Sequence, residues 1–479
     1  MNVGLPSSDK RRRYREVASI LSRHGLGVVT TGVGIGRVVP FHWGLLGHAR
    51  RDMPYTTAEH MRLALEELGT TAIKLGQILS TRPDLIPADV VAEFEKLRDR
   101  VPPVPTEAII ATIERELCCS AQELFREFDP VPLAAASIGQ VHAATLADGT
   151  HVVVKVRKPG VSETVNVDLA ILADLAKRDA RQELLAENYD LEALVDDFSW
   201  TLRSELDYVR EGRNADRLRE IFGDDPRVVI PTIHWQWTTS SVLVMDRVDG
   251  IRIGDLDLLD DAGLDRSVLA RTSAELLMAQ VFESGFFHAD PHPGNFLVLE
   301  DGRIAMLDFG MVGQLDEELR HLFWQLLIAT VRQDAAAVTD GLEALGVLRS
   351  PAARDAVRRD LHHLLERYYG VSVDQFDMTD YINDLLSIVR RQRLQLPAEL
   401  ALLLKTLAMS EGLWQLLDLL STRPASQSLS FRTRRRKCIR RAHGVSASSV
   451  QAATPWNLAP ICRASSVGSL PGSTAASSR

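Results

Sequence analysis

The sequence predicts an α+β fold of two lobes with a helical extension before them, in a chain of 479 residues. Apolar residues recur at three- and four-residue steps in "MRLALEELGTTAIKLGQIL" and again from Leu264 to Leu420, a spacing typical of amphipathic helices. Between these regions, "IGQVHAATL" and "HVVVKV" have the β-branched composition of strands. We therefore expect a small lobe that contains a sheet, a large helical lobe, and a cleft between them that suits a ligand.

Composition and charge limit the classes of function. Hydrophobic residues make up 45% and charged residues 25% of the chain, as in ordinary globular proteins. The net charge of −9 argues against a nucleic-acid partner. Residues 421–479 contain ten Lys or Arg and no Asp or Glu, so residues 1–420 carry −19. This change of composition predicts a basic, Ser-rich, disordered tail.

Neither cysteine usage nor hydropathy indicates secretion or a membrane span. Cys118 and Cys119 are adjacent, and the four cysteines lack metal-ligand spacing, which favours a reducing compartment. The first residues lack the apolar stretch of a signal peptide. Arg37 interrupts the glycine-rich stretch 25–47, which leaves charge-free runs shorter than the roughly 20 residues of a membrane span. We expect a cytoplasmic protein without a transmembrane segment, and peripheral contact with a membrane stays open.

The elements are expected in a definite order. Residues 10–100 have helical spacing, "DRVPPVPTE" breaks it, and Thr106 is expected to cap a helix from Glu107 to Leu117. The two strand runs are joined by Ala147-Asp148-Gly149, a hairpin signal. Helical spacing returns from Glu163 to about Ile221.

A second strand pair is expected in "VVIPTIHWQ" and "SVLVMDRV", followed by helices with short strands near Phe296–Leu299 and Ile304–Leu307. These signals divide the chain into an N-terminal helical extension (1–105), a small lobe (106–250), a helical large lobe (251–420) and a tail (421–479).

The stretch "FFHADPHPGNFLVLEDGRIAMLDFG" (286–310) has the spacing of phosphoryl-transfer chemistry. Asn295 follows Asp290 by five positions, and Asp308 begins an Asp-Phe-Gly thirteen positions later. Protein kinases place a catalytic Asp, a metal-binding Asn and Asp-Phe-Gly in this order. A polar turn followed by a hairpin would explain any one of these pieces but not their joint order. We therefore predict a site for ATP or ADP.

Each polar residue of this stretch has an expected role. Asp308 and Asn295 are expected to hold Mg²⁺ ions on the nucleotide, and Asp290 to position or deprotonate the phosphoryl acceptor. We expect His288 to pack behind the loop. His292 is interpreted as a loop residue, with a phosphate contact as the alternative.

An upstream lysine is expected to bind the phosphates. Lys155 ends the run Val152-Val153-Val154-Lys155, where a lysine is costly unless it is paired. Candidate partners lie in "SELDYVREGRN", where Glu205 and Glu211 are six positions apart. On one helix they would lie about 240° apart, so they cannot serve the same partner.

The loop that covers the phosphates departs from that of ordinary kinases. Two glycines of the G-x-G-x-x-G-x-V pattern are replaced by alanine, which favours a loop of another shape that holds the nucleotide differently, with a helix start as the alternative. The expected nucleotide-binding residues are Ala134, Ala135, Ala136, Ser137, Ile138, Gly139 and Val141. No Ser, Thr or Tyr lies between Asp308 and Thr330, so a phosphorylated activation segment is not expected.

Taken together, these residues resemble the UbiB family of atypical kinases, also called the aarF-domain or ADCK family. The resemblance covers roughly residues 60–420. It rests on "KLGQ" with "STRPDLIP", "AAASIGQVH", "VVKVRKPG", "ELDYVREGRN", "FFHADPHPGN" and "LDFG". It implies a protein-kinase-like fold whose N-terminal Lys-x-Gly-Gln helix covers the place where a peptide substrate would bind.

The resemblance also implies roles for further residues. Lys74 and Gln77 would face the nucleotide cleft as regulatory residues, and Glu205 and Asp207 would lie against their helix. Glu211 would pair with Lys155. The implied function is ATP turnover in support of isoprenoid quinone biosynthesis or lipid metabolism, with anionic membrane lipid and quinone-biosynthesis proteins as partners. "RTRRRKCIRR" in the tail could bind lipid headgroups.

Two other functions stay open. "DPHPGN" is similar to the catalytic loops of aminoglycoside and choline kinases, so a small-molecule phosphotransferase is one alternative, although "KLGQ" and "AAAS" argue against it. A nucleotide-gated scaffold is the other. The presence of Lys155, Asp290, Asn295 and Asp308 argues against an inactive site.

Overall fold

The computed structural model describes residues 7–24, 55–80, 82, 86–97, 102–179, 191–223, 225–348, 351–369, 378–392, 394 and 396–418. The chain forms two compact units, and both are discontinuous in sequence. Unit 1 comprises Met1–Arg219, Ile230–Asp249 and Asp308–Met311, and unit 2 comprises Glu220–Val229, Gly250–Leu307 and Val312–Arg479. The mixture of helices and sheets confirms the predicted α+β class. The predictions for the tail and for residues 25–47 lie outside the described residues.

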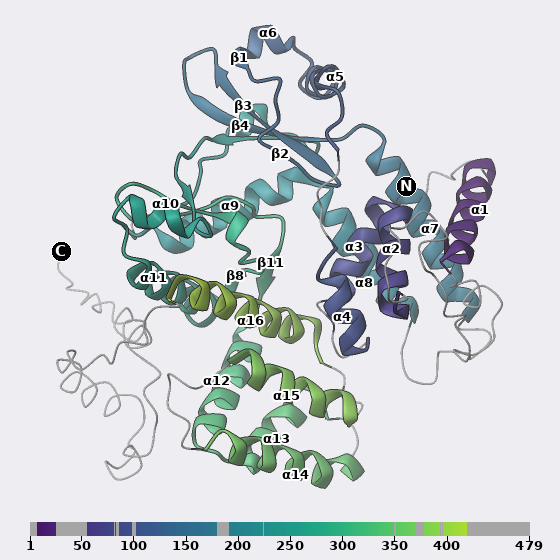
Figure 1. Ribbon diagram of the computed structural model, residues 1–479, viewed down its shortest axis with the longest axis vertical. Helices are drawn as coiled ribbons and strands as arrows, with labels where there is room; N and C mark the ends of the chain where they lie inside the picture. Colours follow the sequence, from purple (N-terminus) through teal and green to yellow (C-terminus); the bar gives the residue numbers. More distant parts are fainter. Residues whose placement is uncertain are drawn as a thin grey trace, which may run out of the picture. The chain divides into compact units, whose positions relative to one another are not determined.

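Unit 1 contains an antiparallel sheet in the order β1-β3-β4-β6, with β2 paired to β3 (Figure 1). The predicted hairpin is β3–β4, and Gly149 in its turn has φ +93°. Along β4, Val152, Val154 and Val156 are fully buried, while the residues between them face the opposite side. The strands are β1 (Phe125–Phe128), β2 (Ala134–Ala135), β3 (Gly139–Leu146), β4 (His151–Arg157) and β6 (Val242–Asp246).

Helices α5 (Thr106–Leu117) and α6 (Ala121–Leu124) cover the valine face of the sheet. The prediction that Thr106 caps α5 is wrong. Thr106 is the first residue of the helix, because Pro105, with φ −53° and ψ 139°, holds the N-cap position. The Thr106 hydroxyl instead donates to the carbonyl of Pro130 (2.8 Å). Cys118 and Cys119 after α5 are free thiols.

The N-terminal part of unit 1 is helical, as predicted, over the residues described there. Helices α2, α3 and α4 share a core of Ala58, Ile73, Val90, Phe94 and Leu97, and α3 also contacts α7 and α8 (Figure 1). Gly76 allows their close packing, because a Cβ there would lie 2.3 Å from Leu97 Cδ1 and would displace that side chain. The helices are α1 (Ser7–Arg23), α2 (Thr57–Leu68), α3 (Thr70–Ser80), α4 (Ala88–Phe94), α7 (Val161–Asp179) and α8 (Leu191–Glu205).

The prediction that "VVIPTIHWQ" and "SVLVMDRV" form a strand pair is wrong. Strand β6 pairs with β4, whereas β5 (Val228–Val229) pairs in parallel with β10 in unit 2. The two predicted strands share only the bridge between Ile233 and Met245. Pro231 has no N–H for a ladder, and the turn η2 (Trp235–Trp237) interrupts the extended chain.

Unit 2 contains a sheet in the order β5-β10-β9-β7 and the separate pair β8–β11. Strands β9 (Phe296–Val298) and β10 (Ile304–Met306) confirm the predicted short strands. The others, β7 (Ile251–Arg252), β8 (Phe286–His288) and β11 (Val312–Gln314), are too short to show an alternating pattern. In the β8–β11 pair His288 lies opposite Val312 and Phe286 opposite Gln314.

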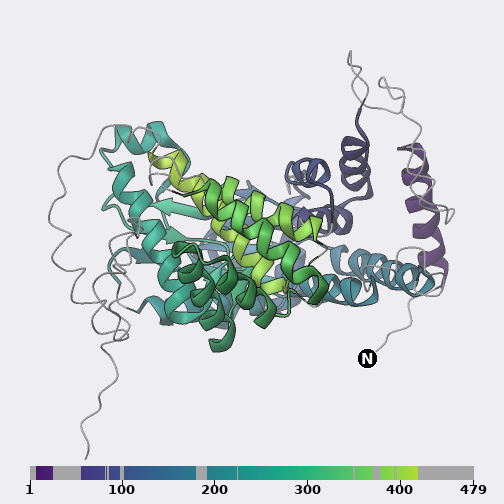
Figure 2. The ribbon, with the colours of Figure 1, turned by 90° about the horizontal axis from the view of Figure 1, so that it is seen from below.

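The rest of unit 2 is helical, as predicted. Its helices are α10 (Leu256–Asp261), α11 (Arg266–Met278), the π-helix η3 (Ala279–Ser284), the turn η4 (Pro293–Asn295), α12 (Glu317–Val331), α13 (Ala335–Ala344), α14 (Pro351–Arg367), α15 (Met378–Arg391) and α16 (Ala398–Asp418). Helix α16 packs along α11 and α15 (Figures 1 and 2).

Within the described residues, only Ala398–Leu417 of α16 is long and apolar enough to cross a membrane by length and composition. More than half of this stretch is buried against the rest of the protein. It is therefore weak evidence of a membrane span.

Candidate nucleotide site

Lys155 on β4 forms an ion pair with Glu211 on α9 (Tyr208–Phe222), as the resemblance implied. The Lys155 Nζ atom lies 2.7 and 2.9 Å from the two Glu211 carboxylate oxygens. It also lies 3.3 Å from Asp308 Oδ2. The side chain of Glu211 is 5% exposed and that of Lys155 18%, whereas that of Asp308 is 46% exposed. The cluster is therefore open to a ligand from the Asp308 side.

This cluster holds two carboxylates and one ammonium group, so negative charge is in excess. Burial raises the pKa of Glu211 to about 7, and the Asp308 charge acts in the same direction, against the opposing charge of Lys155. Burial acts to lower the pKa of Lys155, but the charges of Asp308 and Glu211 hold it well above its ordinary value. A cation bound at Asp308 would compensate the excess charge.

Tyr208 packs against Lys155 in this cluster. It was not identified from the sequence. Its side chain is almost fully buried, and Lys155 Nζ lies 5.3 Å from the centre of its ring. Its hydroxyl has no hydrogen-bond partner in the described structure. A Cβ on Gly139 would lie 2.2 Å from this hydroxyl, so only glycine fits there. The sequence signal that could have identified this residue is the tyrosine that ends "ELDY".

The Ala-rich loop is a tight hairpin, so the alternative of a helix start is wrong. Ala134 pairs with Val141, and the Ala136 amide donates to the Gly139 carbonyl (2.9 Å). The hairpin is anchored on the N-terminal helices, because Thr70 Oγ1 donates to the Ser137 carbonyl (3.2 Å). Ile138 packs among apolar side chains of α3, α7 and α8. Nucleotide binding by this loop stays a prediction.

The predicted regulatory residues contact α8 and the chain after α4. Lys74 Nζ lies 3.0 Å from Glu205 Oε2, and Gln77 Nε2 donates to the Leu97 carbonyl (3.2 Å). Asp207 accepts from the Val209 amide (3.1 Å) where α9 begins. Glu205 ends α8 and therefore lies on a different helix from Glu211. The single helix assumed from the sequence is wrong, but the two glutamates do serve different lysines.

Asp290 and Asn295 belong to unit 2, where they are joined directly. Asn295 Nδ2 donates to Asp290 Oδ2 (2.9 Å) and to the Asp290 carbonyl (3.0 Å). The Asn295 side-chain oxygen is then the atom suited to a metal ion. His292 caps the turn η4 by accepting from the Gly294 amide (3.0 Å), which gives this loop residue a structural role. Its phosphate contact stays a prediction.

His288 is buried behind the loop, as predicted. Its Nδ1 accepts from the Asp290 amide (3.2 Å), and its ring packs on Phe296. The His288 amide in turn donates to Gln280 Oε1 (2.8 Å), and Thr406 Oγ1 donates to the Ala289 carbonyl (3.3 Å). No sequence motif pointed to Gln280 or Thr406.

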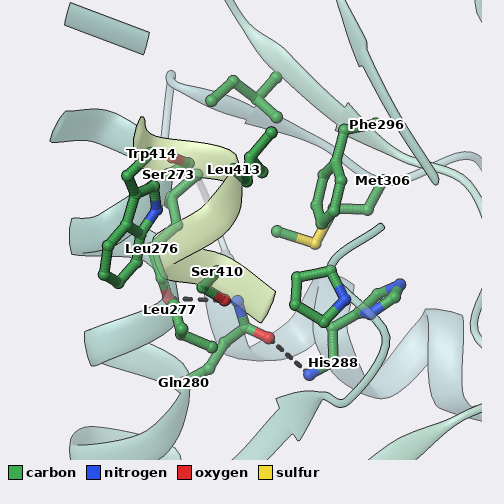
Figure 3. A pocket seen from close by; sticks show the side chains of 12 residues that line it. Ser273, Leu276, Leu277, Gln280, His288, Phe296, Met306, Ser410, Leu413 and Trp414 are labelled. Carbon is green, nitrogen blue, oxygen red and sulfur yellow. Dashed lines mark hydrogen bonds between the residues drawn. The ribbon is translucent and has the colours of Figure 1, made fainter. Parts of the chain in front are cut away.

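A small, mostly apolar pocket lies behind this loop (Figure 3). The figure shows the Gln280 side chain beside His288, where it accepts a hydrogen bond from the backbone of that residue. The pocket encloses about 20 Å³, which is far too little for a nucleotide. It is lined by side chains of α11, η3, β9, β10 and α16 together with His288 and Pro291.

Asn295 in unit 2 and Asp308 in unit 1 each carry side-chain oxygens of the kind that Mg²⁺ takes as ligands, and Mg²⁺ is usually held by one or two carboxylates together with phosphates and waters. Among the described residues, no group of three or more His, Cys, Asp or Glu side chains is arranged to hold a metal. A magnesium ion that receives most of its ligands from a nucleotide needs no such group. The Leu307 amide donates to the Asn295 carbonyl (3.0 Å), and Asp308 is the next residue in the chain.

The chain is similar to proteins of one family. Residues 96–342 match the ABC1 atypical kinase-like domain, and residues 361–419 match the UbiB helical domain. The uncharacterized protein sll1770 of Synechocystis is 37% identical over 75% of this chain and 62% of its own length. The probable protein kinase UbiB of Marinobacter nauticus is 38% identical over 74% of this chain and 66% of its own length. The chain thus spans less than two thirds of both relatives.

A solved structure is similar as well. The Rv3197–erythromycin complex from Mycobacterium tuberculosis is 26% identical and covers 74% of this chain and 90% of that one, with a TM-score of 0.51.

Proposed function

Because this chain belongs to the ABC1 atypical kinase-like family, we propose that it binds Mg-ATP and hydrolyses it or transfers its terminal phosphoryl group. The observation that carries this proposal is the buried ion pair of Lys155 and Glu211 beside the half-exposed Asp308. Kinase-like phosphoryl transfer uses a lysine for the phosphates, an acidic partner that holds it, and an aspartate for the metal.

Each residue of the cluster then has a role. Glu211 fixes the ammonium group of Lys155 through both of its oxygens, so that this group is oriented before the nucleotide arrives. Lys155 binds the phosphates. Asp308 would hold a magnesium ion, which would supply the positive charge that neutralises the phosphates. The hairpin of Ala134 to Val141 covers the nucleotide.

The loop of unit 2 that contains Asp290 and Asn295 acts on the phosphoryl acceptor. Asp290 orients or deprotonates the attacking hydroxyl or water, and the hydrogen bond from Asn295 fixes its carboxylate. The oxygen of Asn295 contributes to the metal site. His288 holds the Asp290 amide and takes no part in proton transfer.

We propose further that ATP turnover supports isoprenoid quinone biosynthesis or lipid metabolism, at the surface of an anionic membrane and together with quinone-biosynthesis proteins. The support for this step is the family resemblance and the name of the Marinobacter relative. Because the chain spans less than two thirds of that relative, the substrate and partners are proposals of their own.

The test is Mg²⁺-dependent ATP hydrolysis by the full chain, with and without anionic liposomes, beside Asp308→Asn. We expect turnover that liposomes raise and that the substitution reduces at least a hundredfold. Turnover that requires an added hydroxyl compound would instead support a small-molecule phosphotransferase. Nucleotide binding without turnover above the Asp308→Asn level would support the scaffold.

A further inference from the structure

Asp308–Met311 belongs to unit 1, although Leu307 before it and Val312 after it belong to unit 2. The tetrapeptide therefore packs with a different part of the protein from the strands that flank it in sequence. It packs with unit 1 because helix α9 holds Phe309, the residue after the proposed metal ligand.

Helix α9 contacts the backbone of Phe309. Asn214 Nδ2 donates to the Phe309 carbonyl (2.9 Å), and the Phe309 amide lies near the Glu211 carboxylate, whose pKa it acts to lower. Glu211 and Asn214 are three positions apart on the helix, which places them on neighbouring points of one face. The Phe309 side chain is fully buried. The backbone of Phe309 is thus held by one rigid element, through the hydrogen bond from Asn214.

The neighbouring Asp308 carboxylate is fixed as a consequence. Its Oδ1 accepts from the Gly310 amide (2.9 Å), and its Oδ2 faces Lys155. Because Phe309, which lies between Asp308 and Gly310 in sequence, is held in place, the Asp308 carboxylate has little freedom to rotate away from Lys155. The pairing of Lys155 with Glu211 and the placement of Asp308 therefore depend on the same helix.

We propose that Asn214 is a positioning residue for the metal site, and that α9 rather than the flanking strands sets where Asp308 stands. This inference rests on the proposed nucleotide site. The amide of asparagine suits the role because it donates to a carbonyl without adding charge beside Lys155. Leucine has nearly the same size but would leave the Phe309 carbonyl without its partner.

The test compares Asn214→Leu with Arg213→Ala, a change at the exposed neighbouring position of the same helix. Two quantities are measured on the full chain: the affinity for ADP in EDTA, and the affinity for Mn²⁺ in the presence of ADP by electron paramagnetic resonance. We expect Asn214→Leu to keep the metal-free ADP affinity within twofold and to weaken Mn²⁺ binding roughly tenfold. Arg213→Ala should match the wild type in both.

A purely structural role of Asn214 would give a different result. It would lower the unfolding temperature and weaken both affinities together, or leave Mn²⁺ binding unchanged, and either result would overturn the inference. If Asn214→Leu does not fold, Asn214→Ala provides the same test, because it removes the donor without adding charge. A wild type that binds no nucleotide would refute the proposed function itself, whereas normal Mn²⁺ binding by both variants would refute only the role of Asn214.

Discussion

The Nζ atom of Lys155 lies within 2.9 Å of both carboxylate oxygens of Glu211, in surroundings that exclude most water. Removing one member of a buried pair leaves the other uncompensated, which typically costs 3–5 kcal/mol. Both residues are therefore expected to matter for folding as well as for nucleotide binding. Asp308, which is half exposed, is the safer residue for separating activity from stability.

The raised pKa of Glu211 predicts how stability depends on pH. Its folded-state pKa of about 7 lies above the ordinary 4.5, so the folded protein binds this proton more tightly than the unfolded chain. The stabilisation is fully present below pH 4.5 and is lost as the pH rises through 7. Urea unfolding should show the wild type losing roughly 1–3 kcal/mol between pH 5 and pH 8 relative to Glu211→Gln. Parallel curves for the two proteins would refute the prediction.

The unpaired hydroxyl of Tyr208 predicts an unusual result for Tyr208→Phe. Removing a buried hydroxyl that lacks a partner should leave stability unchanged or raise it by up to about 1 kcal/mol. Gly139→Ala should lower stability by roughly 1–3 kcal/mol, because its methyl group would meet the Tyr208 hydroxyl and the Val156 carbonyl. Thermal unfolding of the double variant should show partial recovery. Equal losses in the single and double variants would mean that Tyr208 is not the obstacle.

Gln280 is expected to support turnover without contacting the nucleotide. Gln280→Leu removes the side-chain oxygen that accepts from the His288 amide, which loosens the loop that carries Asp290. Steady-state kinetics should show kcat reduced roughly tenfold, with ADP affinity within twofold of the wild type. Gln325→Leu on α12, at an exposed position, is the matched control. A loss of ADP affinity as large as the loss of kcat would contradict this role.

The pairing of Lys74 and Glu205 predicts a measurable coupling between α3 and α8. Both side chains are largely buried, so the pair should contribute more than an exposed one, about 1–2 kcal/mol. A double-mutant cycle of Lys74→Met and Glu205→Gln, read by urea unfolding, measures this coupling. Strictly additive effects would show that the contact contributes nothing to the packing of α3.

The sequence predicted the family, the α+β class and the pairing of Lys155 with Glu211, because these depend on motifs of fixed spacing. It also predicted the β3–β4 hairpin, since a clear turn separates two long β-branched runs. The partner of β5 was missed, because a strand of two residues is defined by the strand beside it and not by its own pattern. Thr106 was misplaced because Pro105 already fixes the start of α5.

The supporting residues of the site were harder to predict. Gln280, Thr406 and Asn214 act through backbone groups of residues eight or more positions away in sequence, so no local spacing identifies them. The predicted roles of Asp290, Asn295 and Asp308 remain to be tested by experiment.

The β8–β11 pair brings the two ends of the stretch from Ala289 to Met311 together, since His288 and Val312, which flank the stretch, lie side by side. A transplant of this stretch could therefore be joined at two adjacent positions. It would also have to match β5, β7 and Asn214, which bind β10, β9 and Phe309 within it. Position 313 needs glycine opposite Phe287, because a Cβ there would strike the Phe287 ring. A transplant should therefore include both residues.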